Sequence, residues 1–195
     1  VLLAIIMVSG LLLVSNTAFP AYFAGAQFVH FLLGPATVAL AVPLYRHLPQ
    51  VRRALLPMLL ALVAGSAAAI VSSLLLARLF GLGTAATLAL APKSSTAAIA
   101  MGIGETIGAD PALVAMLTIM TGICGAVAVT PLMNLLRLKN YAARGFAAGL
   151  ASHGIGTARA FQVNSLAGTF AGIALGLNGL LTAVLVPLLL PLLLK

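Results

Sequence analysis

The chain has 195 residues, of which 63% are hydrophobic and only 6% are charged, and its mean hydropathy is +1.22. A soluble domain carries about a quarter charged residues, so this composition argues against a soluble enzyme and indicates an all-α integral membrane protein. The formal net charge of +8 does not indicate nucleic-acid binding, because most basic residues fall between apolar stretches, as the positive-inside bias expects. The single cysteine, Cys124, provides no disulfide or metal motif, and we expect no metal or cofactor.

The hydropathy pattern predicts a single polytopic membrane domain over residues 1–195, with about seven membrane segments. Residues 1–14 are apolar but short for a span of about 20 residues, and the chain begins with Val, so we expect a further segment to precede them. The next apolar segment, residues 28–45, is interrupted at 34–37 by Gly-Pro-Ala-Thr, where Pro35 suits the first turn of a new half-helix.

Five apolar stretches follow in the rest of the chain. Three are uncharged and long enough to cross a membrane, at residues 54–77, 111–136 and 167–194. The other two, residues 84–103 and 142–162, each contain a polar break. We therefore expect two or three discontinuous or re-entrant helices.

Charge placement predicts how the first broken segment crosses the membrane. The loops at residues 46–53 and 137–144 hold three basic residues each, so both are expected on the cytoplasmic side. This requires the segment 84–103 to enter and return on one side. A faint repeat at a shift of about sixty residues suggests inverted halves, 54–109 and 110–195, as many transporters have.

The first polar break, at residues 90–101, reads Leu-Ala-Pro-Lys-Ser-Ser-Thr-Ala-Ala-Ile-Ala-Met. These polar groups, and the backbone that Pro92 frees, cannot face lipid and must line something. Hydroxyl residues cap the start of a half-helix, whose positive end, together with a lysine, suits a small anion. The alternatives are that the lysine reaches the membrane interface and that the hydroxyls only cap their own backbone. The candidate site residues here are Lys93, Ser94, Ser95 and Thr96.

The second break, at residues 150–161, also combines hydroxyl groups with one cation. Glycines let backbone approach a ligand closely, arginine can grip a carboxylate with two hydrogen bonds, and His153 could carry a coupling proton. Arg159 could instead be a topology anchor, and His153 could be a hydrogen-bonding residue between packed helices. The candidate site residues here are Ser152, His153, Gly154, Gly156, Thr157 and Arg159. We expect the two breaks to form one shared polar site near the membrane midplane, with Arg159 as a supporting cation beside Lys93.

An intramembrane hydrolase is a weaker alternative. Lys93-Ser94 and Ser152-His153 supply a nucleophile and a base, but neighbouring residues on a helix do not face one another. Neither pair forms a catalytic dyad by itself, so we expect no enzyme activity.

Three ordered motifs strongly resemble the LrgB/CidB family. They are Phe-Leu-Leu-Gly-Pro-Ala-Thr-Val-Ala-Leu-Ala-Val-Pro-Leu-Tyr at residues 31–45, Ala-Pro-Lys-Ser-Ser-Thr-Ala-Ala-Ile-Ala-Met at 91–101, and Ala-Arg-Gly-Phe-Ala-Ala-Gly-Leu-Ala-Ser-His-Gly-Ile-Gly-Thr-Ala-Arg-Ala at 143–160. The family includes the plastid glycolate/glycerate translocator and bacterial proteins described as antiholin-like or as murein-hydrolase regulators. Some members are linked to the uptake of pyruvate-like acids with a small LrgA-type partner.

The chain departs from the family pattern in two places. Ser95 stands where the family usually has Val, and the LrgA-like half of the plastid protein is absent, so the resemblance implies that any such partner is a separate chain. The family's acidic residue in the loop after the motif at 91–101 matches Glu105, which the resemblance makes a second candidate, beside His153, for proton coupling.

The sequence thus predicts a secondary transporter for a small monocarboxylate such as glycolate, glycerate, pyruvate or lactate, coupled to H⁺ or Na⁺. We expect alternating access of the elevator kind, with the re-entrant elements moving as a unit, and a homodimer or higher oligomer in the lipid bilayer. The alternative is a holin- or antiholin-like pore or regulator of murein hydrolase export and cell lysis. No transit peptide is visible, which favours the bacterial cytoplasmic membrane over the plastid inner envelope.

Overall fold

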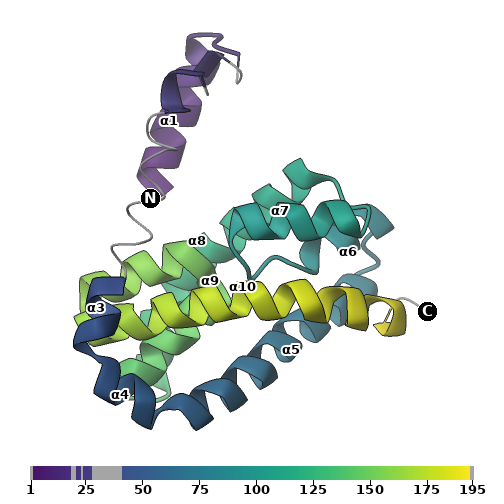
Figure 1. The fold of residues 1–195 in the computed structure, drawn as a ribbon. Helices are drawn as coiled ribbons and strands as arrows, with labels where there is room; N and C mark the ends of the chain where they lie inside the picture. Colours follow the sequence, from purple (N-terminus) through teal and green to yellow (C-terminus); the bar gives the residue numbers. More distant parts are fainter. Residues whose placement is uncertain (1, 19–20, 23, 28–40, 194–195) are drawn as a thin grey trace. The chain divides into compact units, whose positions relative to one another are not determined.

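The computed structural model describes residues 2–18, 21–22, 24–27 and 41–193, and these residues form helices and connections without a strand (Figure 1). The predicted interruption at 34–37 and most of the segment 28–45 lie outside the described residues. The helices are α1 (Leu2–Val14), α3 (Ala41–Arg46), α4 (Leu48–Arg53), α5 (Leu55–Leu79), α6 (Thr84–Leu90), α7 (Ala97–Thr106), α8 (Pro111–Leu135), α9 (Tyr141–Val163) and α10 (Ser165–Leu193).

The chain forms two compact units, Val1–Arg46 and His47–Lys195. In the first unit, α1 is an apolar helix of 13 residues with exposed leucine and methionine side chains. Its length of about 20 Å is less than a bilayer core of about 30 Å. The second unit contains the long helices and both polar breaks.

Three described helices, α5, α8 and α10, are long and apolar enough to cross a membrane. They confirm the helices predicted at residues 54–77, 111–136 and 167–194 to within a few residues. α8 begins as the sequence suggests, because the Asp110 carboxylate accepts a hydrogen bond of 2.8 Å from the Leu113 amide and Pro111 occupies the first turn. The total of about seven segments stays a prediction.

The first break separates α6 from α7. α6 ends at Leu90, and α7 starts at Ala97 with Thr96 as its cap, accepting a hydrogen bond from the Ile99 amide. The stretch predicted at residues 84–103 ends three residues too early. α7 runs to Thr106 and includes Glu105 in its last turn, because no residue in that stretch breaks the helix before Gly108 at φ +78°.

The second break reverses the direction of α9. Ser152 and His153 have non-helical backbone angles, and His153 has φ +41°. Beyond them the chain folds back, since a Cβ added to Gly156 would lie 2.5 Å from the carbonyl oxygen of Ala148, eight residues earlier. In a straight helix those residues would be about 12 Å apart. α9 is therefore a hairpin of two limbs, residues 141–151 and 154–163.

The glycines of α9 let its first limb lie against α10. A Cβ added to Gly145 would meet the Ala167 carbonyl oxygen at 1.9 Å, and one added to Gly149 would meet that of Ala171 at 2.0 Å. Gly149 follows Gly145 in the first limb, and its partner Ala171 likewise follows Ala167 in α10. The first limb therefore runs parallel to α10. The second limb returns to the start of α10 at Ser165.

The two basic loops lie at the same end of the second unit. Ala54, before α5, and Asn140, before α9, line one groove together with Met133 near the end of α8. We call this end the basic end. The cations that flank it in sequence are Arg52, Arg53, Arg137 and Lys139. α5 thus leads away from the basic end, and α8 leads back to it.

Two hairpins therefore enter the second unit from opposite ends. Hairpin 1, made of α6, residues 91–96 and α7, starts and finishes at the end opposite the basic end, where Arg78 donates a hydrogen bond to the Leu193 carbonyl. Hairpin 2, made of the two limbs of α9, starts and finishes at the basic end. The tips are residues 91–96 in hairpin 1 and 152–153 in hairpin 2.

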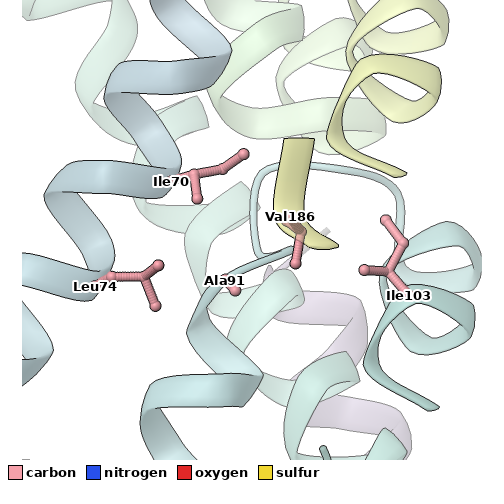
Figure 2. Close-up of a cluster of buried hydrophobic side chains, with 5 residues drawn as sticks. All are labelled: Ile70, Leu74, Ala91, Ile103 and Val186. Atoms are coloured by element: carbon pink, nitrogen blue, oxygen red, sulfur yellow. The ribbon is translucent and has the colours of Figure 1, made fainter. Parts of the chain in front are cut away.

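Hairpin 1 is anchored by an apolar cluster between α5 and α10. Figure 2 shows side chains from four segments of the chain converging at this place. All are at least 94% buried, and partly buried leucines near the end of α10 pack around them. The cluster comprises Ile70 and Leu74 of α5, Ala91 of the tip, Ile103 of α7 and Val186 of α10.

The glycine contacts of hairpin 2 give a stability prediction. Gly149→Ala forces a methyl group against the α10 backbone and is expected to destabilise the protein by about 1–3 kcal/mol. Gly172→Ala on α10 is the matched control, because no atom lies within 4 Å of its added Cβ. Thermal unfolding of the purified protein in detergent measures both. Equal melting temperatures for the two variants would contradict the close packing.

Candidate functional site

A cavity of about 580 Å³ lies where the two hairpin tips meet the middle of α5 and α8. Both polar breaks contribute to it, so the structure brings together residues of the two breaks, which are about sixty residues apart in sequence. The lining residues are Gly65, Ala69, Leu90, Lys93, Ser94, Leu117, Met120, Thr121, Cys124, Gly125, Ala128, Leu150, Ala151 and Ser152.

The polar residues of the first tip divide into two groups. Lys93 and Ser94 line the cavity, and the Lys93 ammonium lies 3.4 Å from the Ser94 hydroxyl oxygen. Ser95 is fully buried and donates a hydrogen bond of 3.0 Å to the Pro92 carbonyl, while Thr96 caps α7. Ser95 and Thr96 thus hold the tip in shape, and Lys93 and Ser94 present polar groups to the cavity.

Ser152 is the residue of the second tip that lines the same cavity. Its side chain is 1% exposed, and its hydroxyl has no hydrogen-bond partner within the described part of the chain. The hydroxyl fits against Gly125 of α8, where an added Cβ would lie 1.8 Å from the oxygen. A buried hydroxyl without a partner costs free energy, and a ligand that hydrogen-bonds to it would remove that cost.

The other residues of the second tip support its fold. The His153 ring nitrogen Nε2 lies 2.9 Å from the Thr118 carbonyl oxygen, and the ring packs against Gly122. Thr157 donates a hydrogen bond of 2.8 Å to the His153 carbonyl. Gly156 allows the close approach of the two limbs described above. His153, Gly156 and Thr157 therefore lie behind the cavity wall.

Three candidate residues are not brought to the cavity. Arg159 is exposed and donates a hydrogen bond of 3.3 Å to the Gln162 side chain, because the second limb carries it back toward the basic end. Gly154 is exposed, with open space around its Cβ position. Glu105 is exposed on α7. The expected pairing of Arg159 with Lys93 around one ligand is not present.

Sequence reasoning missed the wall that α8 contributes. Leu117, Thr121, Cys124 and Ala128 recur at spacings of three and four, which places them on one helix face. Cys124, interpreted from sequence as a packing residue, is exposed and lines the cavity. The face is mostly small and apolar, so only its periodicity could have indicated it.

A second residue missed as a site component is Asn178 in the middle of α10. Its side-chain nitrogen donates hydrogen bonds to the carbonyls of Ser94, at 2.9 Å, and Leu150, at 3.1 Å. One side chain thus contacts both broken segments. An asparagine within an apolar span was the only sequence signal for it.

The cavity has the chemistry of a small-anion site. Among its described lining residues, Lys93 is the one that carries a charge, and Ser94 and Ser152 add hydroxyl groups. The Thr121 hydroxyl donates to the Leu117 carbonyl at 2.8 Å. α7 and the second limb of α9 both begin at the tips, so their N-terminal ends, which bear partial positive charge, start near the cavity. A carboxylate fits this combination of donors.

The architecture is that of a helical membrane protein with two opposed hairpins around an anion-suited cavity. A family model described as the LrgB-like family matches residues 1–192. The chain belongs to the LrgB family, which confirms the resemblance noted in its motifs.

Individual relatives agree with this assignment. The chain is 36% identical over 173 residues to YwbG of Bacillus subtilis (strain 168), covering 89% of this chain and 77% of that protein. It is 32% identical over 182 residues to the antiholin-like protein LrgB of Bacillus mycoides (strain KBAB4), covering 92% and 79%. The antiholin-like protein LrgB of Bacillus cereus (strain B4264) is 31% identical over 182 residues, again covering 92% of this chain and 79% of that protein. No solved structure matches the chain.

Cys124 provides a direct probe of the charge in the cavity. We predict that the anionic reagent sulfonatoethyl methanethiosulfonate modifies Cys124 faster than the cationic trimethylammonioethyl methanethiosulfonate. This preference should fall about tenfold in Lys93→Ala, because a partly buried cation attracts anions strongly in a low-dielectric site.

Mass spectrometry of the modified protein measures the two rates, and Cys124→Ala gives the background. Arg159→Ala removes one positive charge outside the cavity and should leave the preference unchanged. An equal loss in both variants would contradict the placement of Lys93.

Proposed function

We propose that the protein is a secondary transporter of short monocarboxylates such as glycolate, glycerate, pyruvate or lactate. The observation that supports this most strongly is the convergence of Lys93, Ser94 and Ser152, from two separate hairpins, on one cavity in the middle of the second unit. Transport requires no bond to be made or broken, and we include no enzymatic step.

The hairpin arrangement supports an alternating-access mechanism. Each proposed half, 54–109 and 110–195, begins with a long helix followed by a hairpin, and the two hairpins enter from opposite ends. This is the inverted organisation in which transporters place a substrate site at the bilayer midplane. α6 has 7 residues and α7 has 10, lengths of about 10 and 15 Å, or up to half of a 30 Å core. Both tips would then lie near the midplane.

The charge of the cavity favours a substrate with a single carboxylate. Lys93 balances one negative charge, whereas a second carboxylate would be buried without a cation, at a large desolvation cost. The hydroxyl groups of Ser94 and Ser152 are placed to bind the carboxylate or a neighbouring hydroxyl or keto group of the acid. The selectivity proposed is therefore for small monoanions over dianions.

We extend the proposal to coupling and to assembly. His153 is the preferred carrier of a coupling proton, since its ring is buried directly beneath the Ser152 tip, and Na⁺ is the alternative ion. Glu105 is less favoured, because it is exposed on α7. By the positive-inside bias, the basic end faces the cytoplasm of a bacterial cell. We also propose that the protein assembles as a homo-oligomer, with or without a small LrgA-type partner.

The names of relatives support a second candidate function. Two of the matched proteins are named antiholin-like, which favours a pore or a regulator of murein hydrolase export. A pore passes unrelated solutes without saturation. A carrier shows saturable flux that competing substrates reduce, so the two functions can be separated in one assay.

The first functional prediction concerns Lys93 in proteoliposomes. Uptake of at least one of labelled glycolate, glycerate, pyruvate and lactate should saturate, and Lys93→Ala should reduce it by about tenfold to a hundredfold, because a hydrogen bond to a charged group contributes about 1.5–3 kcal/mol. Arg159→Ala is the matched control and should stay within about threefold of wild type, because Arg159 lies outside the cavity.

Labelled sucrose in the same vesicles tests the pore. Sucrose entry equal to acid entry, unaffected by Lys93→Ala, would reject the carrier in favour of the pore. A loss of acid uptake in Arg159→Ala as large as in Lys93→Ala would reject the cavity described here as the substrate site.

The second functional prediction concerns coupling. An inward proton gradient should accelerate uptake of the acid, and His153→Gln should remove this acceleration while Glu105→Gln retains it. The comparison uses the same vesicles with an imposed pH or sodium gradient. Acceleration by sodium alone, unchanged in His153→Gln, would assign coupling to Na⁺ instead.

A further inference from the structure

The Asn178 side chain is the most completely hydrogen-bonded polar group in the interior of the second unit. It is 1% exposed and lies halfway along α10. Its amide nitrogen donates to the carbonyls of Ser94 and Leu150, and its oxygen accepts from the hydroxyls of Ser66, at 2.6 Å, and Thr182, at 3.4 Å. An amide has two N–H donors and two acceptor positions, and all four are used.

The network also fixes which way the amide points. Backbone carbonyls only accept hydrogen bonds, so the NH₂ group must face Ser94 and Leu150, and the oxygen must face Ser66. Ser66 is itself 1% exposed and comes from α5. A buried side chain held at both of its polar atoms cannot rotate without breaking two or more hydrogen bonds.

The two carbonyls that Asn178 binds belong to the two hairpins. Ser94 follows Lys93 in the first tip, and Leu150 comes two residues before Ser152 in the second tip. Both Ser94 and Leu150 line the cavity, whereas Asn178 does not. The amide lies outside the cavity lining and therefore sets the distance between the two hairpin segments that carry Lys93 and Ser152.

We propose that Asn178 is a positioning residue that clasps the two hairpin tips together, with Ser66 orienting its amide, so that Lys93 and Ser152 are held at a fixed separation around the substrate. This inference rests on the proposed function. It adds that the tips of hairpins 1 and 2 keep one geometry while the cavity is occupied, because a single rigid group joins them.

Asn178→Asp is the most informative variant. Aspartate keeps the size of the side chain and the oxygen that Ser66 contacts, but it replaces the two N–H donors with an acceptor facing two carbonyls. Asn164→Asp is the matched control. The Asn164 oxygen accepts from the Leu166 and Ala167 amides, and an aspartate preserves such acceptor bonds.

Two readouts separate positioning from general stability. The first is the maximal uptake rate and KM per folded molecule, with the folded fraction determined by size-exclusion chromatography. The second is the preference of Cys124 for the anionic over the cationic thiol reagent, which reports on Lys93 without any substrate. Asn178→Asp should lower the maximal rate at least about tenfold and the Cys124 preference about threefold or more. Asn164→Asp should change neither by more than about twofold.

Ser66→Ala keeps the test decisive if Asn178→Asp does not fold. It leaves both N–H donors in place but removes the shorter of the two hydrogen bonds to the amide oxygen. It should lower the maximal rate about two- to fivefold and the Cys124 preference in the same direction. Wild-type values of both readouts in folded Ser66→Ala and Asn178→Asp protein, with only the yield reduced, would overturn the positioning role. If wild type transports no acid but its Cys124 preference still depends on Asn178, the proposed function fails and the clasp stands.

Discussion

The structure depends on how two broken helices are accommodated where no water is available. A helix that stops halfway across a bilayer leaves backbone groups unpaired, each at a cost of about several kcal/mol. Here Ser95 and Thr96 satisfy groups of the first tip locally. Asn178 binds the Ser94 carbonyl in the first tip and the Leu150 carbonyl just before the second tip. The same bonds that make the breaks tolerable also bring the breaks together.

The geometry of the cavity follows from that solution. Once the tips are fixed in the middle of the unit, Lys93 reaches the cavity from hairpin 1 and Ser152 reaches it from hairpin 2, while glycines on α8 make room for the second tip. One cation, several hydroxyls and two helix starts then surround a single volume. This combination suits a small carboxylate. The proposed transport of monocarboxylates uses each of these groups.

Much of the fold could be predicted from residue patterns, because long uncharged runs and their basic flanks determine where helices span and which loops share a side. The position of the breaks was also predictable, since Pro92 and the polar residues after it have no place in a lipid-facing helix. The placement of Arg159 away from the cavity has a geometric cause. Its distance in sequence from Ser152 is small, but the reversal at His153 directs the second limb away from the first tip.

Asn178 shows why other parts of the site could not be read from sequence. Its partners are backbone carbonyls 84 and 28 residues away. Every residue has a backbone carbonyl, so a sequence pattern does not show which one is bonded. The α8 wall is similar, because Met120, Cys124 and Gly125 are ordinary residues of an apolar helix until the tips are placed against them. Such contacts become visible only once the fold defines which surfaces meet.

The measurement that tests the central claim most directly is the rate at which N-ethylmaleimide alkylates Cys124 in the presence of each short monocarboxylate. Cys124 lies in the wall of the cavity, so an acid bound between the hairpin tips should slow alkylation several-fold in a saturable way, and glucose should not. Lys93→Ala should remove the protection. Alkylation at the same rate with and without all four acids would contradict the assignment of this cavity as a monocarboxylate site.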